Sequence, residues 1–148
     1  NLPYYITSKI ITKIVSSSTP INRLVAMVQK EVALKLCSEE KTPLKMMIDY
    51  VGDVQYELNV PRHVFMPAPH VDSAVISIHK ERVISQELID LIEASYTAKR
   101  KTLYNNLKSL YHDQTKELLE SCGIPVNKRA EELNIDDYIR ILERGHTL

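Results

Sequence analysis

Apolar and polar residues follow helix-like and strand-like periods in turn up to about residue 80, which predicts an α/β arrangement. Ile10, Ile11, Ile14 and Val15 fall on one helical face, and the hydroxyl-rich segment 16–20 ends that helix. The segment 24–28 is continuously apolar. This pattern predicts a strand buried on both faces, of the kind found inside parallel sheets.

The next periods predict two more helices and two more strands. Val32, Ala33, Leu36 and Cys37 have helical spacing, and Pro43 opens a short helix that Gly52 ends. Strict alternation over 54–60 predicts a strand with one buried face. The apolar run 74–78 predicts a strand that pairs with it as an antiparallel edge.

From Ser85 onward every period is helical, so we predict two domains, residues 1–82 and residues 83–148. Ser85 is placed to cap the first helix and Asp113 the second, which ends at Gly123. Asn134 is placed to cap a final helix that ends at Gly145.

Composition favours a globular protein, with 44% hydrophobic and 26% charged residues. Neither a membrane-spanning stretch nor a signal peptide is predicted, which indicates a cytoplasmic location. Cys37 and Cys122 lie in apolar helical surroundings and are interpreted as buried thiols of a reducing compartment. The five histidines are scattered, so no metal site is predicted.

Charge is balanced, with 9 basic against 7 acidic residues up to Lys80 and 10 against 12 beyond it. Any nucleic-acid surface must therefore be a local patch.

The tetrapeptide Asn1-Leu2-Pro3-Tyr4 is the first candidate for chemistry. The Asn1 carboxamide oxygen and a main-chain carbonyl held by Pro3 could accept both N–H bonds of an exocyclic amine, while the Tyr4 ring stacks on the attached base. A nitrogen held in this way could attack a methyl group without a strong base. The alternative is a plain turn with a packed tyrosine.

Two further segments carry candidate residues. Pro67 and Pro69 stiffen a loop that would hold Phe65 out as a ring for base stacking, unless Phe65 is simply a core residue. In the run 99–108, a helix would place Lys101, Asn105 and Lys108 on one polar face. That face could contact phosphate or could simply be solvated.

Together these segments resemble the bacterial small-subunit ribosomal RNA adenine dimethyltransferases over nearly the whole chain. The resemblance rests on the following segments: Asn1-Leu2-Pro3-Tyr4, Gln29-Lys30-Glu31-Val32-Ala33, residues 65–75 (FMPAPHVDSAV), Arg100-Lys101-Thr102-Leu103 with Asn105-Asn106-Leu107, and Arg129-Ala130-Glu131-Glu132-Leu133. It implies the C-terminal part of a Rossmann-like class I methyltransferase sheet followed by a small helical, RNA-orienting domain.

The resemblance also implies an activity, namely S-adenosylmethionine-dependent dimethylation of N6 on two adjacent adenines near the 3′ end of small-subunit rRNA, in the immature 30S subunit. Asn1 and the Leu2 carbonyl would receive the adenine amine within the Asn1 to Tyr4 motif, and Asn1 would border the cofactor. Tyr4 and Phe65 would stack on the flipped base. Lys99, Arg100, Lys101 and Asn105 would contact RNA.

The sequence departs from the family pattern at Tyr5 and Tyr104, and it lacks a glycine-rich cofactor loop, since its three glycines are Gly52, Gly123 and Gly145. We therefore expect a fragment without activity of its own, with an unpaired strand edge beside residues 24–28.

Two alternatives remain. One is a large-subunit rRNA adenine methyltransferase of the antibiotic-resistance type, which lacks the Arg100 to Leu107 element. The other is a binding module without catalysis, either a ribosome-assembly factor or a helical nucleic-acid regulator.

Overall fold

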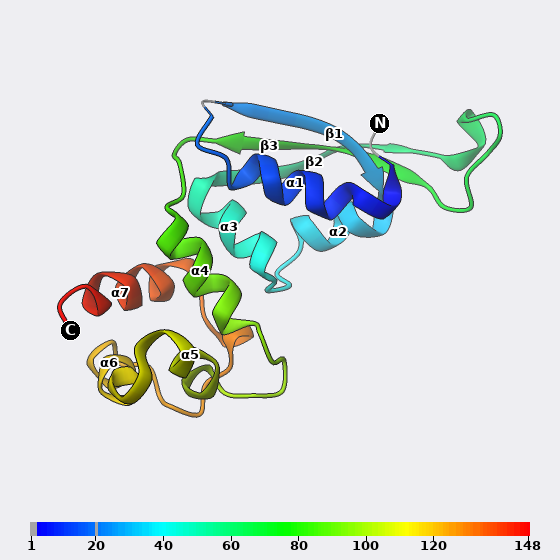
Figure 1. Cartoon of the computed structure of the whole chain (residues 1–148). Coiled ribbons are helices and arrows are strands. Elements are labelled where there is room, and N and C mark those ends of the chain that lie inside the picture. The colour runs from blue at the N-terminus through cyan, green and yellow to red at the C-terminus, as the bar shows by residue number, and fades with distance from the viewer. Residues whose placement is uncertain (1–2, 20) are drawn as a thin grey trace. The chain divides into compact units, whose positions relative to one another are not determined.

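The computed structural model describes residues 3–19 and 21–148, without the side chain of Tyr4 (Figure 1). The chain divides into two units, residues 1–40 with 48–83 and residues 41–47 with 84–148. Residues 41–47, which we predicted as part of the first domain, thus belong to the second unit.

The first unit contains the mixed α/β part of the chain. Its elements are η1 (Tyr4–Ile6), α1 (Thr7–Val15), β1 (Arg23–Gln29), α2 (Lys30–Cys37), the end of α3 (Pro43–Val51), β2 (Gly52–Val60), η2 (Arg62–Val64) and β3 (Ser73–Lys80). These bounds agree with the periodicities of the sequence, because apolar spacing determines which element can bury one face.

The three strands form one sheet in the order β1-β3-β2, and both pairs are antiparallel. The pairing of the two later strands was predicted, although β3 lies in the centre of the described sheet and not at its edge. Cross-strand partners place Ile76 and Ile78 of β3 on one face with Ala26 of β1, and all three side chains are buried. Helix α2 contacts all three strands.

Strand β1 differs from the prediction in two respects. It pairs antiparallel with β3, and Val25 is 59% exposed, so it is not buried on both faces within the described residues. Alternate side chains of a strand point to opposite faces, and only the face of Ala26 and Val28 packs against the core. An unbroken apolar run cannot distinguish this arrangement from a strand covered on both sides.

A buried lysine joins α1 to β3. Lys80 is 6% exposed, and its Nζ donates to the carbonyls of Ile14 and Ser17, both at 3.0 Å. The Ile14 carbonyl lies in the last turn of α1 and also accepts from the Ser17 N–H at 3.2 Å, and the Ser17 carbonyl lies just beyond the end of the helix. Burial lowers the pKa of Lys80.

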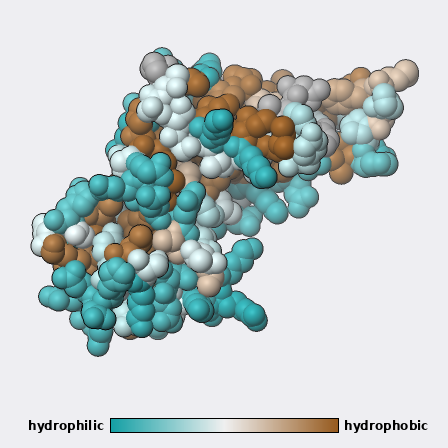
Figure 2. All heavy atoms as spheres, in the orientation of Figure 1, coloured by the Kyte–Doolittle hydropathy of each residue, from teal (hydrophilic) through white to brown (hydrophobic). Residues whose placement is uncertain are grey.

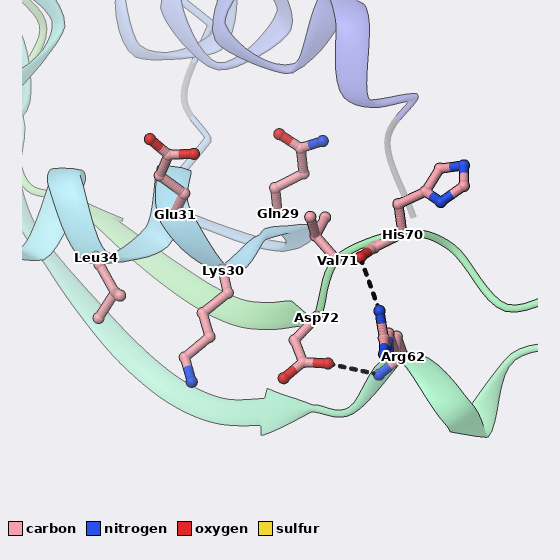
Figure 3. Close-up of a pocket in the computed structure, with 8 residues that line it drawn as sticks. All are labelled: Gln29, Lys30, Glu31, Leu34, Arg62, His70, Val71 and Asp72. Carbon is pink, nitrogen blue, oxygen red and sulfur yellow. Dashed lines mark hydrogen bonds between the residues drawn. The ribbon is translucent and has the colours of Figure 1, made fainter.

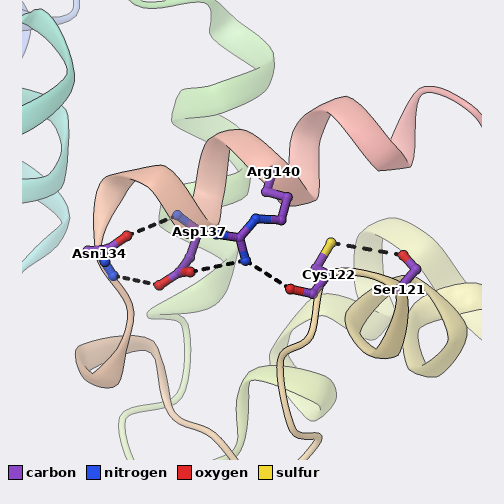
Figure 4. A network of polar contacts seen from close by, with 5 residues as sticks. All are labelled: Ser121, Cys122, Asn134, Asp137 and Arg140. Atoms are coloured by element: carbon purple, nitrogen blue, oxygen red, sulfur yellow. Dashed lines mark hydrogen bonds and ion pairs between the residues drawn. The ribbon is translucent and has the colours of Figure 1, made fainter.

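The second unit is helical, with elements α4 (Gln86–Ser95), α5 (Leu103–Tyr111), η3 (His112–Gln114), α6 (Thr115–Ser121), η4 (Ala130–Glu132) and α7 (Ile135–Gly145). The predicted caps at Ser85 and Asn134 are confirmed, since Ser85 Oγ accepts from the Leu88 N–H and Asn134 Oδ1 from the Asp137 N–H. Figure 4 shows the second cap together with Arg140, whose Nη1 donates to the Cys122 carbonyl at 2.8 Å.

Two local predictions were wrong. Asp113 does not cap α6, because it lies inside η3 and the residue before α6 is Gln114, which makes no side-chain cap. Cys37 is exposed, whereas Cys122 is buried as predicted. Cys37 follows the buried Leu36 by one position, and one step along a helix turns a side chain by about 100° away from its neighbour.

The two units differ in the character of their surfaces. Figure 2 shows apolar residues gathered over much of the sheet unit, while the helical unit presents a largely hydrophilic surface. The exposed large apolar side chains between β1 and β3 are Val25, Leu34, Leu58, Val64, Met66 and Val71. Val64, Met66 and Val71 lie in the loop that joins β2 to β3.

Candidate functional site

One end of the sheet brings together the segments that the sequence singled out in the first unit. Gln29 at the end of β1 and Val60 at the end of β2 both pair with Ser73, the first residue of β3. The start of α1 lies beside this end of β1 (Figure 1). The loop 61–72 leaves from the same end, because it joins β2 to β3.

The turn that follows the first residues is held by one carbonyl. Asn1 and Leu2 lie outside the described residues, as does the side chain of Tyr4. The Pro3 carbonyl accepts from the Ile6 N–H at 3.2 Å and from Thr7 Oγ1 at 3.0 Å. Thr7 is only 2% exposed. Sequence reasoning missed this contact, because the Thr7 hydroxyl bonds to the backbone of the turn and not to another side chain.

Replacing Thr7 with valine is expected to lower kcat of a full-length enzyme carrying this chain about fivefold, since one hydrogen bond is worth about 1 kcal/mol. The turn would lose one of two bonds that orient it, while the volume stays the same. KM for RNA should be unchanged and Thr7→Ser should restore kcat. Equal activity of the valine and wild-type enzymes would remove Thr7 from this role.

The loop 61–72 is closed at its base by Arg62. The Arg62 backbone N–H donates to Asp72 Oδ1 at 2.9 Å, and Arg62 Nη1 donates to the His70 carbonyl at 3.2 Å (Figure 3). Phe65 is half-buried, so its ring is neither a full core residue nor freely exposed. Met66, next to it, is 98% exposed. An apolar tip on a closed loop can contact bases.

A pocket of about 560 Å³ lies between this loop and the start of α2. Its lining comes from the end of β1, from the first turns of α2 and from both ends of the loop. The lining residues are Gln29, Lys30, Glu31, Leu34, Arg62, His70, Val71 and Asp72. None of them was predicted as a site residue, although Gln29 to Glu31 and His70 to Asp72 belong to segments that carried the resemblance.

In the second unit, the predicted basic residues lie together in a turn. Lys99, Arg100 and Lys101 are exposed, and no ion pair involves them in the part of the chain that the structure describes. The helix begins only at Leu103, because Thr102 Oγ1 caps it by accepting from the Asn105 N–H. We expected Lys101 to share a helical face with Asn105 and Lys108. This prediction was wrong, because Lys101 precedes the helix. Lys108 instead lies over the Tyr104 ring, with its Nζ 4.4 Å from the ring centroid.

The two neighbouring asparagines of α5 have different roles. Asn105, predicted to contact substrate, is exposed. Asn106 is 8% exposed, and its Nδ2 donates to the carbonyls of Ser95 at 2.7 Å and Ala98 at 3.2 Å. Asn106 thus anchors the turn that carries Lys99 to Lys101.

A second basic segment joins this turn. The Leu103 N–H donates to the Lys128 carbonyl at 2.7 Å, which brings Lys128 and the exposed Arg129 to the start of α5. The hydroxyls of Tyr96 and Tyr138 both lie 3.5 Å from the Ala130 carbonyl. Burial raises the pKa of Tyr96 to about 12 and raises that of Tyr138 as well, so both hydroxyls keep their protons even in alkaline solution. We call Lys99, Arg100, Lys101, Lys128 and Arg129 the basic surface.

Among residues 3–19 and 21–148, no cluster of His, Cys, Asp or Glu could hold a metal ion, and no helix is long and apolar enough to cross a membrane. Gly52 pairs in the sheet, while Gly123 and Gly145 close helices, so none builds a glycine-rich turn for S-adenosylmethionine.

Comparison with known proteins yields one family. The model of the ribosomal RNA adenine dimethylase family matches residues 1–146. A ribosomal RNA small subunit methyltransferase A from Fusobacterium nucleatum is 37% identical, over 97% of this chain and 59% of the relative. The protein of the same name from Mesoplasma florum is 34% identical, over 97% of the chain and 58% of the relative. The chain thus spans less than two thirds of the length of these relatives.

Two solved structures share the fold. A dimethyladenosine transferase from Plasmodium falciparum superimposes with a TM-score of 0.83 at 23% identity, covering 99% of this chain and 65% of the other. The 23S rRNA methyltransferase ErmE gives a TM-score of 0.65 at 21% identity, covering 97% and 62%. The α/β part followed by a helical part is therefore an arrangement known from methyltransferases.

Proposed function

Since the chain belongs to the ribosomal RNA adenine dimethylase family, we propose that it is the substrate-recognition part of an enzyme that dimethylates N6 of two adjacent adenines near the 3′ end of small-subunit rRNA. The partner is the immature 30S subunit in the cytoplasm. S-adenosylmethionine is the methyl donor, bound largely by residues outside those described. Both relatives named above are small-subunit rRNA methyltransferases.

One observation carries the proposal. The turn at Pro3 to Thr7 and the Phe65 loop lie at the same end of the sheet (Figure 1). In open α/β sheets, ligands bind in the crevice outside the carboxyl ends of strands. This shared position of the Pro3 to Thr7 turn and the loop supports the proposal that the tetrapeptide and Phe65 act on one base.

The chain's own groups would act by holding the adenine. The Asn1 carboxamide oxygen and the Leu2 carbonyl accept the two N–H bonds of the amine, so the nitrogen lone pair faces the methyl group. Tyr4 and Phe65 stack on the flipped base from opposite sides. The Thr7 hydroxyl donates a hydrogen bond to the Pro3 carbonyl and so would fix the turn. As the N–C bond forms, the S–CH3 bond of the methyl donor would break and leave a neutral thioether, and the proton of the alkylated nitrogen would then pass to water without a strong base.

The basic surface would bind RNA through phosphate contacts. Lys99, Arg100 and Lys101 were predicted for this role, and Lys128 and Arg129 adjoin them in the second unit. The chain has no net charge, so its affinity must come from such a patch. Glu131 and Glu132 border it and limit its strength; the Arg129 N–H, donating to Glu132, lowers the pKa of that carboxyl.

The principal test is Asn1→Ala in a full-length enzyme carrying this chain. Methyl transfer to a small-subunit 3′ RNA should fall at least about 100-fold, as when a single oriented polar contact to the reacting group is lost. Affinity for the RNA should stay within about twofold, because the basic surface supplies it. Asn22→Ala, an exposed asparagine before β1, is the matched control and should remain fully active.

Two other results would select the alternatives. Full activity of Asn1→Ala with retained RNA binding would indicate a binding module without catalysis. Methylation of a large-subunit hairpin in place of the small-subunit RNA would indicate a resistance-type enzyme, which the shared fold with ErmE permits. The Arg100 to Leu107 element favours the small-subunit RNA.

A further inference from the structure

The pocket beside α2 holds both charges and an apolar wall, and the proposed reaction does not yet use it. Figure 3 shows Lys30, Leu34 and Asp72 extending to the same side of the strand ends, with Arg62 at the far end of the pocket. The Leu34 side chain is 51% exposed. Leu34 supplies an apolar wall of the pocket, on which a flat ring can lie.

The pocket is built by hydrogen bonds across three segments. The Lys30 N–H donates to the Asp72 carbonyl at 3.0 Å, which ties α2 to the loop. Asp72 Oδ1 accepts from the Arg62 N–H at 2.9 Å. In the described part of the chain, the second carboxylate oxygen of Asp72 has no partner. One acceptor is thus fixed in orientation and available to a ligand.

The charges select the kind of ligand. Lys30 and Arg62 are balanced by Glu31 and Asp72, so a purely anionic ligand gains little. A ligand with a phosphate at one end and an amine-bearing flat ring at the other satisfies both signs and covers Leu34. A nucleotide has this chemistry, and pockets of roughly 300–1,000 Å³ suit small ligands of that kind.

We propose that this pocket binds the nucleotide next to the adenine undergoing methylation. The base of that neighbour lies on Leu34 and donates its exocyclic amine to Asp72, while its phosphate meets Lys30. The inference rests on the proposed function, and it follows from position, since Arg62 of the pocket and Phe65 lie three residues apart on one loop. With two adjacent adenines as substrate, the neighbour also carries an amine.

The test pairs a change in the RNA with a change in the protein. A full-length enzyme carrying this chain is assayed on RNA whose neighbouring adenine is replaced by purine riboside, which lacks the amine. We expect KM of the wild type to rise at least about tenfold, in line with one charge-assisted hydrogen bond. Asp72→Asn keeps an oxygen for the Arg62 N–H, and it should bind both RNAs alike.

A second pair of variants tests the other contacts. Leu34→Ala, at an exposed position, should bind normal RNA more weakly than the wild type. Its affinity should no longer change when the nucleotide next to the target adenine lacks its base. Lys30→Ala should raise KM, whereas Lys13→Ala, an exposed lysine of α1, should not. Cofactor affinity should be the same in all variants.

The outcomes separate the two proposals. If the wild type methylates the target adenine but the purine and abasic substitutions leave KM unchanged, the pocket assignment is overturned and the function stands. If Lys30→Ala or Asp72→Asn alters cofactor affinity instead, the pocket belongs to the cofactor site and the assignment is likewise overturned. If no adenine RNA is methylated at all, the proposed function itself fails.

Discussion

Replacing Asn106 with alanine is expected to destabilise the helical unit by about 2–3 kcal/mol and to weaken RNA binding, because buried acceptors lose their donor. The Ser95 carbonyl and the Ala98 carbonyl both depend on Asn106 Nδ2. Ser95 is fully buried, so water cannot replace the lost bond there. Urea unfolding followed by circular dichroism measures the first effect, and filter binding of the 3′ RNA measures the second.

The neighbouring asparagine supplies the control. Asn105→Ala removes the same group from an exposed position and should change the unfolding free energy by less than about 0.5 kcal/mol. Any loss of RNA affinity in that variant would come from direct contact and not from the turn. Equal stability of the two variants would show that Asn106 does not anchor the basic surface.

Replacing Gly52 with alanine is expected to have the largest effect on the sheet, at least about 3 kcal/mol, since overpacking against rigid backbone is costly. A Cβ at this position would lie 1.7 Å from the carbonyl oxygen of His79 and 2.8 Å from its carbon. Both are backbone atoms of the central strand, and Gly52 pairs with Lys80 there. The change forces the start of β2 away from the end of β3, at the opposite end of β2 from the loop that carries Phe65.

Gly145→Ala is the matched comparison for this prediction. A Cβ there would meet only the side chain of Tyr111, the closest atom at 2.9 Å, and a tyrosine ring can turn aside. Thermal unfolding should show a much smaller loss for this variant. A Gly52→Ala protein as stable as Gly145→Ala would contradict the close approach of β2 to β3.

Local signals in the sequence predicted helix ends well where one side chain decides them. Ser85 and Asn134 cap their helices through bonds to residues only three positions away. The prediction that Asp113 caps a helix was wrong, because several polar residues before α6 could cap it and the chain forms η3 there instead. The helical spacing also contained a signal for the burial of Asn106, since this residue lies next to Leu107 on the buried side of α5.

Long-range features could not be predicted in this way. The apolar run of β1 carries no information about strand direction, so its antiparallel pairing was missed. The bond from Leu103 to Lys128 joins segments that nothing in their local pattern links, and so the basic surface was only half predicted. The family, in contrast, was correctly predicted, because its motifs retain their order and spacing along the chain.

The central position of β3 constrains when the sheet can form during synthesis. Within the described residues, β1 and β2 each pair with β3 and not with each other. The pairing of β1 with β3 must therefore wait until α2, α3 and β2 have been made and residues 73–80 have emerged. Such non-local pairing slows folding and leaves apolar strands exposed to aggregation. Nascent chains that stop before residue 73 should therefore depend on chaperones, and those that extend beyond Lys80 should not.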